Sequence, residues 1–141
     1  MPRWFLLALA ILCAPACGSV GRTAPDGVFF PTVPVGNAYP AGEIQGMLEL
    51  RSGCLFVTRP EDRWLLLWPE GYTAREAQGA IEILDEEDDL VAREGDQIRL
   101  GGGERRPIEI GGTAEAERYA SELTGADIPE RCGDLYWLVA P

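Results

Sequence analysis

The sequence predicts a mainly β protein, either a small antiparallel β-barrel of the OB-like type or a β-sandwich, with one short helix near residues 113–124. Two observations lead to this fold class. From Glu43 onward, short apolar or alternating runs recur between turn signals rich in glycine, proline and aspartate, and only one segment has a helical period. The chain has 141 residues, which is enough for one domain of ordinary size.

The expected strands follow from these runs. The run "WLLLW" at 64–68 is apolar on both faces, so we expect this strand to be covered on both sides. The acidic stretch 85–89 is expected to form a hairpin turn, and the turn at 94–96 predicts a hairpin between its two neighbouring strands, which the glycines at 101–103 would end. The complete set of expected strands is 46–50, 54–58, 64–68, 80–84, 90–93, 97–100 and 135–139.

The helix is predicted from its end signals and its apolar face. Thr113 is the expected N-cap, acidic residues follow in the first turn, and Gly125 is suited to end the helix. One apolar face has the spacing i, i+3, i+4, i+7 and consists of Ala116, Tyr119, Ala120 and Leu123.

Residues 1–16 have the parts of a secretory signal peptide. Arg3 supplies a positive charge, and the apolar run from 4 to 14 is too short to span a bilayer, which needs about 20 residues. The sequence Ala14-Pro15-Ala16 fits the small-residue rule for cleavage before Cys17. We therefore expect an exported protein.

The same stretch, "APAC", resembles the lipobox of bacterial lipoproteins, in which the cysteine is diacylated and becomes the new N-terminus. The motif is imperfect, because Ala14 replaces the favoured leucine and Pro15 is not the usual small residue. Cleavage leaves three cysteines, and an odd number in an exported protein needs an explanation. If Cys17 carries lipid, Cys54 and Cys132 remain as a pair, most simply a disulfide in an oxidising compartment. The alternatives are two separate buried thiols, or a Cys17 that is unpaired or bonded to another chain.

The predicted organisation has three parts: a signal peptide at 1–16, a lipid-anchored N-terminus with a glycine- and proline-rich linker at 17–42, and a small β-barrel domain at 43–141. The linker contains the apolar stretch "VFFPTVPV" at 28–35. We expect this stretch to pack along the domain rather than to remain free, because an exposed apolar strand promotes aggregation.

Composition excludes several classes of function. The net charge is −11, which disfavours nucleic acid and direct electrostatic docking on anionic lipids. The chain has no histidine, so a Ser-His-Asp or Cys-His catalytic site is excluded, and so is a zinc site with His/Cys spacing. We expect no cofactor and no metal, since the acidic stretch 85–89 lacks the ligand spacing and turn glycine of a calcium loop.

Two weaker sites remain as candidates. The stretch "LGGGERR" could hold an anion between backbone amides and the side chains of Arg105 and Arg106, although a bulge or bend in a barrel strand is the more ordinary interpretation. The aromatic residues Trp64, Trp68, Tyr72 and Tyr136 either pack in the core, as aromatics usually do in small domains, or form a surface for a peptide, glycan or protein.

The chain also resembles a group of small bacterial exported proteins and lipoproteins that have no established activity. The resemblance covers about two-thirds of the chain and implies fold and location only. It is carried by the stretches "GCL" (53–55), "LLLWPEG" (65–71), "VAREGDQIRLGGGE" (91–104), "PERC" (129–132) and "YWLV" (136–139).

These observations predict a lipid-anchored protein of the bacterial envelope whose small, acidic, disulfide-bonded β-domain binds or scaffolds an unknown protein, peptide or glycan and is not an enzyme. The first alternative is a soluble periplasmic or secreted binding domain without lipid. The second is a small hydrolase that uses two carboxylates, which would need a concave site with two acids facing each other.

Overall fold

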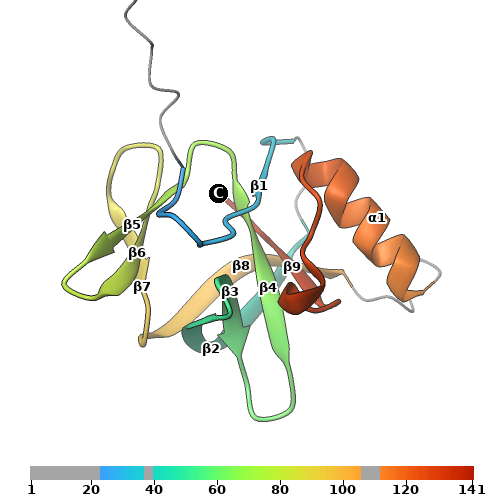
Figure 1. Cartoon of the computed structure of the whole chain (residues 1–141), viewed down its shortest axis with the longest axis horizontal. Helices are drawn as coiled ribbons and strands as arrows, with labels where there is room; N and C mark the ends of the chain where they lie inside the picture. The colour runs from blue at the N-terminus through green and yellow to red at the C-terminus, as the bar shows by residue number, and fades with distance from the viewer. Residues whose placement is uncertain (1–22, 37–39, 106–111) are drawn as a thin grey trace, which may run out of the picture.

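A computed structural model describes residues 23–36, 40–105 and 112–141 (Figure 1). It contains nine strands, one α-helix and one 3₁₀ helix in these residues, and the helix α1 spans Thr113–Thr124. The other elements are β1 (Thr32–Val33), β2 (Gly42–Arg51), β3 (Cys54–Thr58), β4 (Arg63–Pro69), β5 (Thr73–Ala77), β6 (Ala80–Leu84), β7 (Leu90–Arg93), β8 (Gln97–Arg105), η2 (Glu130–Cys132) and β9 (Tyr136–Val139).

Five strands close into a barrel in the order β2-β3-β4-β9-β8, and β8 returns to pair with β2. Four of the five pairings are antiparallel, and β4 with β9 is parallel. The predicted mainly β fold is confirmed, and of the two architectures expected, barrel or sandwich, the structure has the barrel; the predicted helix at 113–124 is the one α-helix of the described residues (Figure 1). Closure leaves none of the five barrel strands as a free edge.

A second, three-stranded sheet, β5-β6-β7, is inserted between β4 and β8. Strands β5 and β6 form a hairpin through Gln78 and Gly79, whose positive φ angles of 52° and 74° suit a tight two-residue turn. The predicted hairpin between 90–93 and 97–100 is wrong, because β7 pairs with β6 while β8 pairs with β2 and β9. The backbone at Gly95 and Asp96 instead bonds to Leu48 of β2, so this turn carries the chain from one sheet to the other.

The N-terminal segment packs on the domain, as expected for the stretch at 28–35. β1 pairs in parallel with the end of β4, and Phe29 bridges to Cys54 at the start of β3. The Phe30 ring stacks on Trp68 with 5.7 Å between ring centroids. Part of the region predicted as a linker therefore packs on the folded domain, while its residues 17–22 and 37–39 lie outside the described part of the chain.

The two faces of β4 are buried in two different hydrophobic clusters, which explains why "WLLLW" is apolar throughout. Trp64, Leu66 and Trp68 point into the cluster inside the barrel, which extends to the small sheet. Leu65 and Leu67 point into a second cluster, beneath α1. All five side chains are no more than 1% exposed.

Helix α1 covers the second cluster with Ala116 and Ala120, both buried, as the apolar face predicted. Gly125 ends the helix in the left-handed conformation, with φ of 65°. Two details differ from prediction. The N-cap is Gly112, with no side-chain cap, so Thr113 does not have the expected capping role, and Tyr119 is exposed.

The predicted disulfide joins Cys54 to Cys132, with 5.6 Å between the Cα atoms. Cys54 begins β3 and Cys132 lies in η2, so the bond fastens the segment before β9 to the barrel. Arg131 adds a second link, because its Nε donates a hydrogen bond of 2.8 Å to the carbonyl of Ser52 in the β2–β3 turn. Both cysteines are fully buried beneath α1.

Candidate ligand-binding cavity

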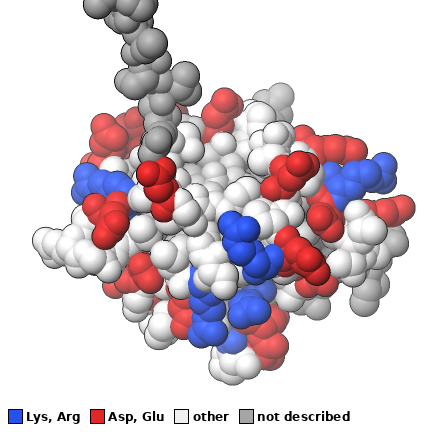
Figure 2. All heavy atoms as spheres, viewed as in Figure 1, with Lys and Arg blue, Asp and Glu red and all other residues white. Residues whose placement is uncertain are grey.

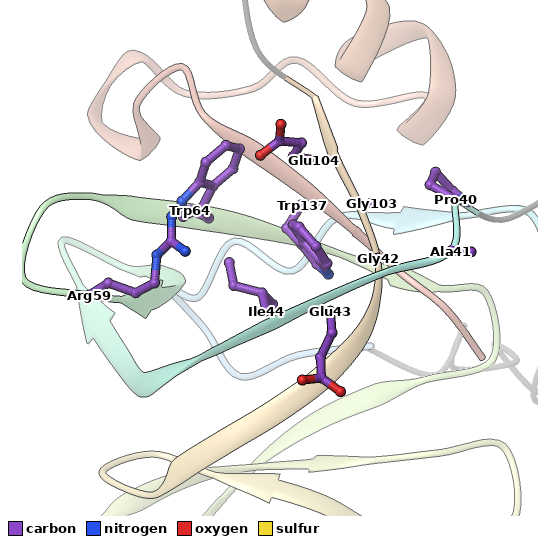
Figure 3. Close-up of a pocket in the computed structure, with 10 residues that line it drawn as sticks. All are labelled: Pro40, Ala41, Gly42, Glu43, Ile44, Arg59, Trp64, Gly103, Glu104 and Trp137. Atoms are coloured by element: carbon purple, nitrogen blue, oxygen red, sulfur yellow. The ribbon is translucent and has the colours of Figure 1, made fainter.

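A cavity of about 400 Å³ opens at one end of the barrel, where β2 begins and the last residues of β8 run past it (Figure 3). Its volume lies within the range of small-molecule sites, about 300–1,000 Å³. The two residues before β2, the strands β2, β4, β8 and β9, and the β3–β4 turn line it: Pro40, Ala41, Gly42, Glu43, Ile44, Arg59, Trp64, Gly103, Glu104 and Trp137.

Two indole rings form the inner wall of the cavity. Trp64 and Trp137 meet edge to face, with 6.3 Å between ring centroids and an interplanar angle of 86°. Trp137 Nε1 donates a hydrogen bond of 3.3 Å to the carbonyl of Gly101, which fixes the orientation of that ring. The rings are 1% and 5% exposed, so they offer a rigid apolar surface at the bottom of the cavity rather than an open stacking platform.

The absence of a side chain at Gly103 lets the chain before β2 pass close to β8 beside the cavity. A Cβ atom on Gly103 would lie 2.1 Å from the Cβ of Pro40, so only glycine lets the chain before β2 cross this point. Proline has no amide hydrogen to donate, so Pro40 cannot continue the β2–β8 ladder beyond the Gly42–Gly102 pair. The β2–β8 ladder therefore ends at the Gly42–Gly102 pair, beside the cavity.

Arg59 is the cationic group of the site. Its Nε and Nη2 atoms donate hydrogen bonds of 2.7 Å each to the two carboxylate oxygens of Asp62. These bonds raise the pKa of the guanidinium above its usual value, with further contributions from the charges of Asp62, Glu61 and Glu104. The guanidinium carbon lies 5.9 Å from the centre of the Trp64 ring. The ion pair and the contact with Trp64 fix the orientation of the Arg59 side chain. The Nη1 atom of Arg59 takes no part in the pair with Asp62.

Two carboxylates lie at the cavity, but they do not face each other. Glu43 is ion-paired with Arg99, and hydrogen bonds from Gln45 and Arg99 lower its pKa, so it is ionised at neutral pH. In Figure 3 the Glu43 and Glu104 side chains extend away from each other on opposite sides of Trp137. A carboxylate-based hydrolase needs one acid kept protonated opposite the other, and this arrangement does not provide that geometry.

Of the two alternatives for the aromatic residues, core packing holds for three of the four, and they form no surface. Trp64, Trp68 and Tyr136 are no more than 1% exposed, because β4 and β9 are covered by the N-terminal segment, the small sheet and α1. Tyr72 is half-buried and stacks on Trp68 with 6.1 Å between ring centroids. Of these residues, Trp64 alone lines the cavity, from inside the barrel.

The glycines of the predicted anion site form a strand and not a loop. Gly102 and Gly103 of β8 pair with Val139 and Leu138 of β9. Strand β8 continues to Arg105 instead of ending at the glycines. Arg106 lies outside the described residues, so an anion site that includes it stays a prediction. The proposed lipidation site, Cys17, also lies outside them.

The acidic stretch forms the expected turn. Asp85 Oδ1 accepts hydrogen bonds from the backbone amides of Glu87 and Asp89, at 3.1 and 2.8 Å, which closes the turn between β6 and β7. Among the residues that the structure describes, no group of three or more acidic or cysteine side chains is arranged to hold a metal ion.

Sequence reasoning did not find Trp137, Arg59, Glu104 or the opening beside Gly103 as one site. Arg59 lies in what reads as an ordinary turn, and Trp137 belongs to an apolar run. Pro40 and the glycines of β2 and β8 were the sequence features that could have indicated the site. That Pro40 lies against Gly103 depends on the β2–β8 register, which the sequence does not show.

The fold and the cavity define the class of this chain: a small disulfide-bonded β-barrel with an end cavity lined by tryptophan and arginine. Comparisons with protein-family models, with curated proteins and with solved structures found no significant match. In the described parts of the chain, no helix is both long and apolar enough to cross a bilayer.

Proposed function

We propose that this chain is a lipid-anchored protein of the bacterial envelope that binds a small ligand, or one residue of a larger one, in the cavity at the end of the barrel, without catalysis. The disulfide supports the anchor indirectly. Because Cys54 and Cys132 are joined, Cys17 is the cysteine of the processed chain that still needs a partner or a modification, and acylation provides one. The imperfect lipobox around Cys17 points to the same modification.

The cavity carries the binding part of the proposal. It combines a rigid apolar wall with a preoriented arginine and the backbone of Gly103, which is the usual composition of a ligand site. The Arg59 guanidinium favours a ligand with a hydrogen-bond acceptor next to an apolar body. The resemblance to small exported bacterial proteins is consistent with this role but does not indicate which ligand is bound.

The anchor is tested by mass spectrometry of the mature N-terminus. We expect a chain that begins at Cys17 and carries the mass of acyl chains, and we expect the protein to enter the detergent phase in phase partitioning. An unmodified Cys17 with partitioning into water would establish the alternative, a soluble periplasmic or secreted domain.

Binding is tested with a fragment library screened by NMR, with the indole N–H signals of the tryptophans as reporters. We expect hits that shift the signals of Trp64 and Trp137 and that bind at least about tenfold more weakly to Arg59→Gln, because a charge-assisted hydrogen bond is lost. Arg118→Gln on the outer face of α1 is the matched control and should bind like the wild type. Hits that avoid the cavity or ignore Arg59→Gln would contradict the proposed site.

A further inference from the structure

The first described residues are bonded to the small sheet. The amide of Ala74 in β5 donates a hydrogen bond of 2.7 Å to the carbonyl of Thr23. Ala24 and Val28 pack against the main hydrophobic cluster, and residues 25–28 lie beside the β5–β6 turn at Gly79. The chain is therefore held by the domain from residue 23 onward.

This attachment leaves a short tether if Cys17 carries lipid. Only residues 18–22 separate Cys17 from Thr23, so the two Cα atoms are at most roughly 20 Å apart, at about 3.3–3.6 Å per residue. A domain of this size is roughly 30–35 Å across, so such a tether is too short for the domain to turn freely above a bilayer.

We propose that the domain faces the membrane with the surface formed by residues 23–28 and the β5-β6-β7 sheet, and that the β3–β4 turn, which carries Arg59, points away from it. This inference rests on the proposed lipid anchor at Cys17. In Figure 1 the described chain begins beside the small sheet, while the β3–β4 turn lies at the opposite end of the molecule.

The charge on this surface sets how closely it approaches the bilayer. Asp26, Glu76 and the acidic residues at 86–89 are exposed there, and Figure 2 shows acidic side chains around the place where the described chain begins. Like charges keep such a surface from inserting into an anionic membrane, but beyond about 8 Å the repulsion is screened at physiological salt. The membrane-facing surface therefore lies above the headgroups, within the reach of the tether.

The orientation is tested by energy transfer from a donor dye on the protein to acceptor lipids in vesicles of neutral and anionic phospholipid. The acylated protein carries the dye at Glu76→Cys in β5 or at Glu61→Cys in the β3–β4 turn, both of which are exposed positions. With the acceptor plane about 20 Å from one label and about 50 Å from the other, we expect transfer several-fold higher from position 76. Equal transfer, or higher transfer from position 61, would overturn the orientation.

A spacer variant is the matched control. Inserting twenty Gly/Ser residues after Gly18 gives a flexible tether with a typical reach of about 25 Å and a much longer maximum, so the two labels should give similar transfer. A difference that persists with the spacer would show that the short tether is not its cause and would refute the inference. Mass spectrometry of the same samples separates the two proposals, because an unmodified Cys17 removes the proposed anchor, whereas acylated protein without orientation removes this inference alone.

Discussion

Removing the Cys54–Cys132 disulfide should cost a large share of the stability of this domain. The bond closes a loop of 78 residues. In the chain-entropy description a loop of this length contributes about 4.5 kcal/mol, because it limits the unfolded chain, and a domain of this size is stable by about 5–15 kcal/mol. Both sulfur atoms are fully buried, so substitution also leaves a small cavity under α1.

The measurement is urea unfolding followed by tryptophan fluorescence, with the Cys54→Ala/Cys132→Ala double variant compared with the oxidised wild type. We expect the free energy of unfolding to fall by about 4–5 kcal/mol and the denaturant slope to rise, because an unfolded chain without the cross-link exposes more surface. Reduced wild-type protein is the matched control, since it loses the cross-link but keeps both sulfur atoms. A loss below about 1 kcal/mol in both samples would refute the argument from loop length.

Three further predictions concern the barrel, the small sheet and the C-terminal strand. Gly102→Ala should destabilise the protein by about 2–4 kcal/mol in urea unfolding, because its φ is 138° and its Cβ would lie 1.9 Å from a backbone carbonyl of β9; Gly101→Ala, with 3.8 Å to its nearest neighbour, should be nearly neutral. Glu82→Gln should cost about 1–2 kcal/mol, since this buried carboxylate pairs with two arginines, whereas the exposed Glu76→Gln should change little; equal effects would contradict the ion-pair argument. Burial, with the charges of two nearby acids, raises the pKa of Tyr136 to about 12, so the stability that depends on its neutral form should be lost as the pH rises from about 10 to about 12. Tyr136→Phe should remove this component of the pH dependence, and an unchanged profile would show that Tyr136 is not its source.

Local signals located most elements correctly. The predicted strands at 54–58, 80–84 and 90–93 and the helix at 113–124 have the observed bounds. These segments combine clear apolar runs or a helical period with strong turn residues at their ends, and both signals act over a few residues. β5, "TAREA", was missed because it buries only Ala74 and has no apolar run; it is a strand because it pairs with β6.

Sequence patterns could not predict which strands pair when the strands are far apart in the chain. The turn at 94–96 has the composition of a hairpin turn, yet it separates two sheets, because β8 finds its partners in β2 and β9. The cavity could not be predicted for the same reason. Pro40, Arg59, Glu104 and Trp137 come from four segments of the chain and meet only through the closure of the barrel.

The sequence by itself determined the β class, the spans of most strands and the helix, because each depends on local period or local turn chemistry. Cysteine number favoured a bond between Cys54 and Cys132, and the tertiary structure decided that they pair. The sequence also showed that both faces of "WLLLW" must be covered. The tertiary structure alone decided what covers them. The parallel pairing of β4 with β9 and the packing of the N-terminal segment turn Trp64 and Trp68 inward, since closing the barrel and its coverings buries more apolar surface than an exposed aromatic patch would.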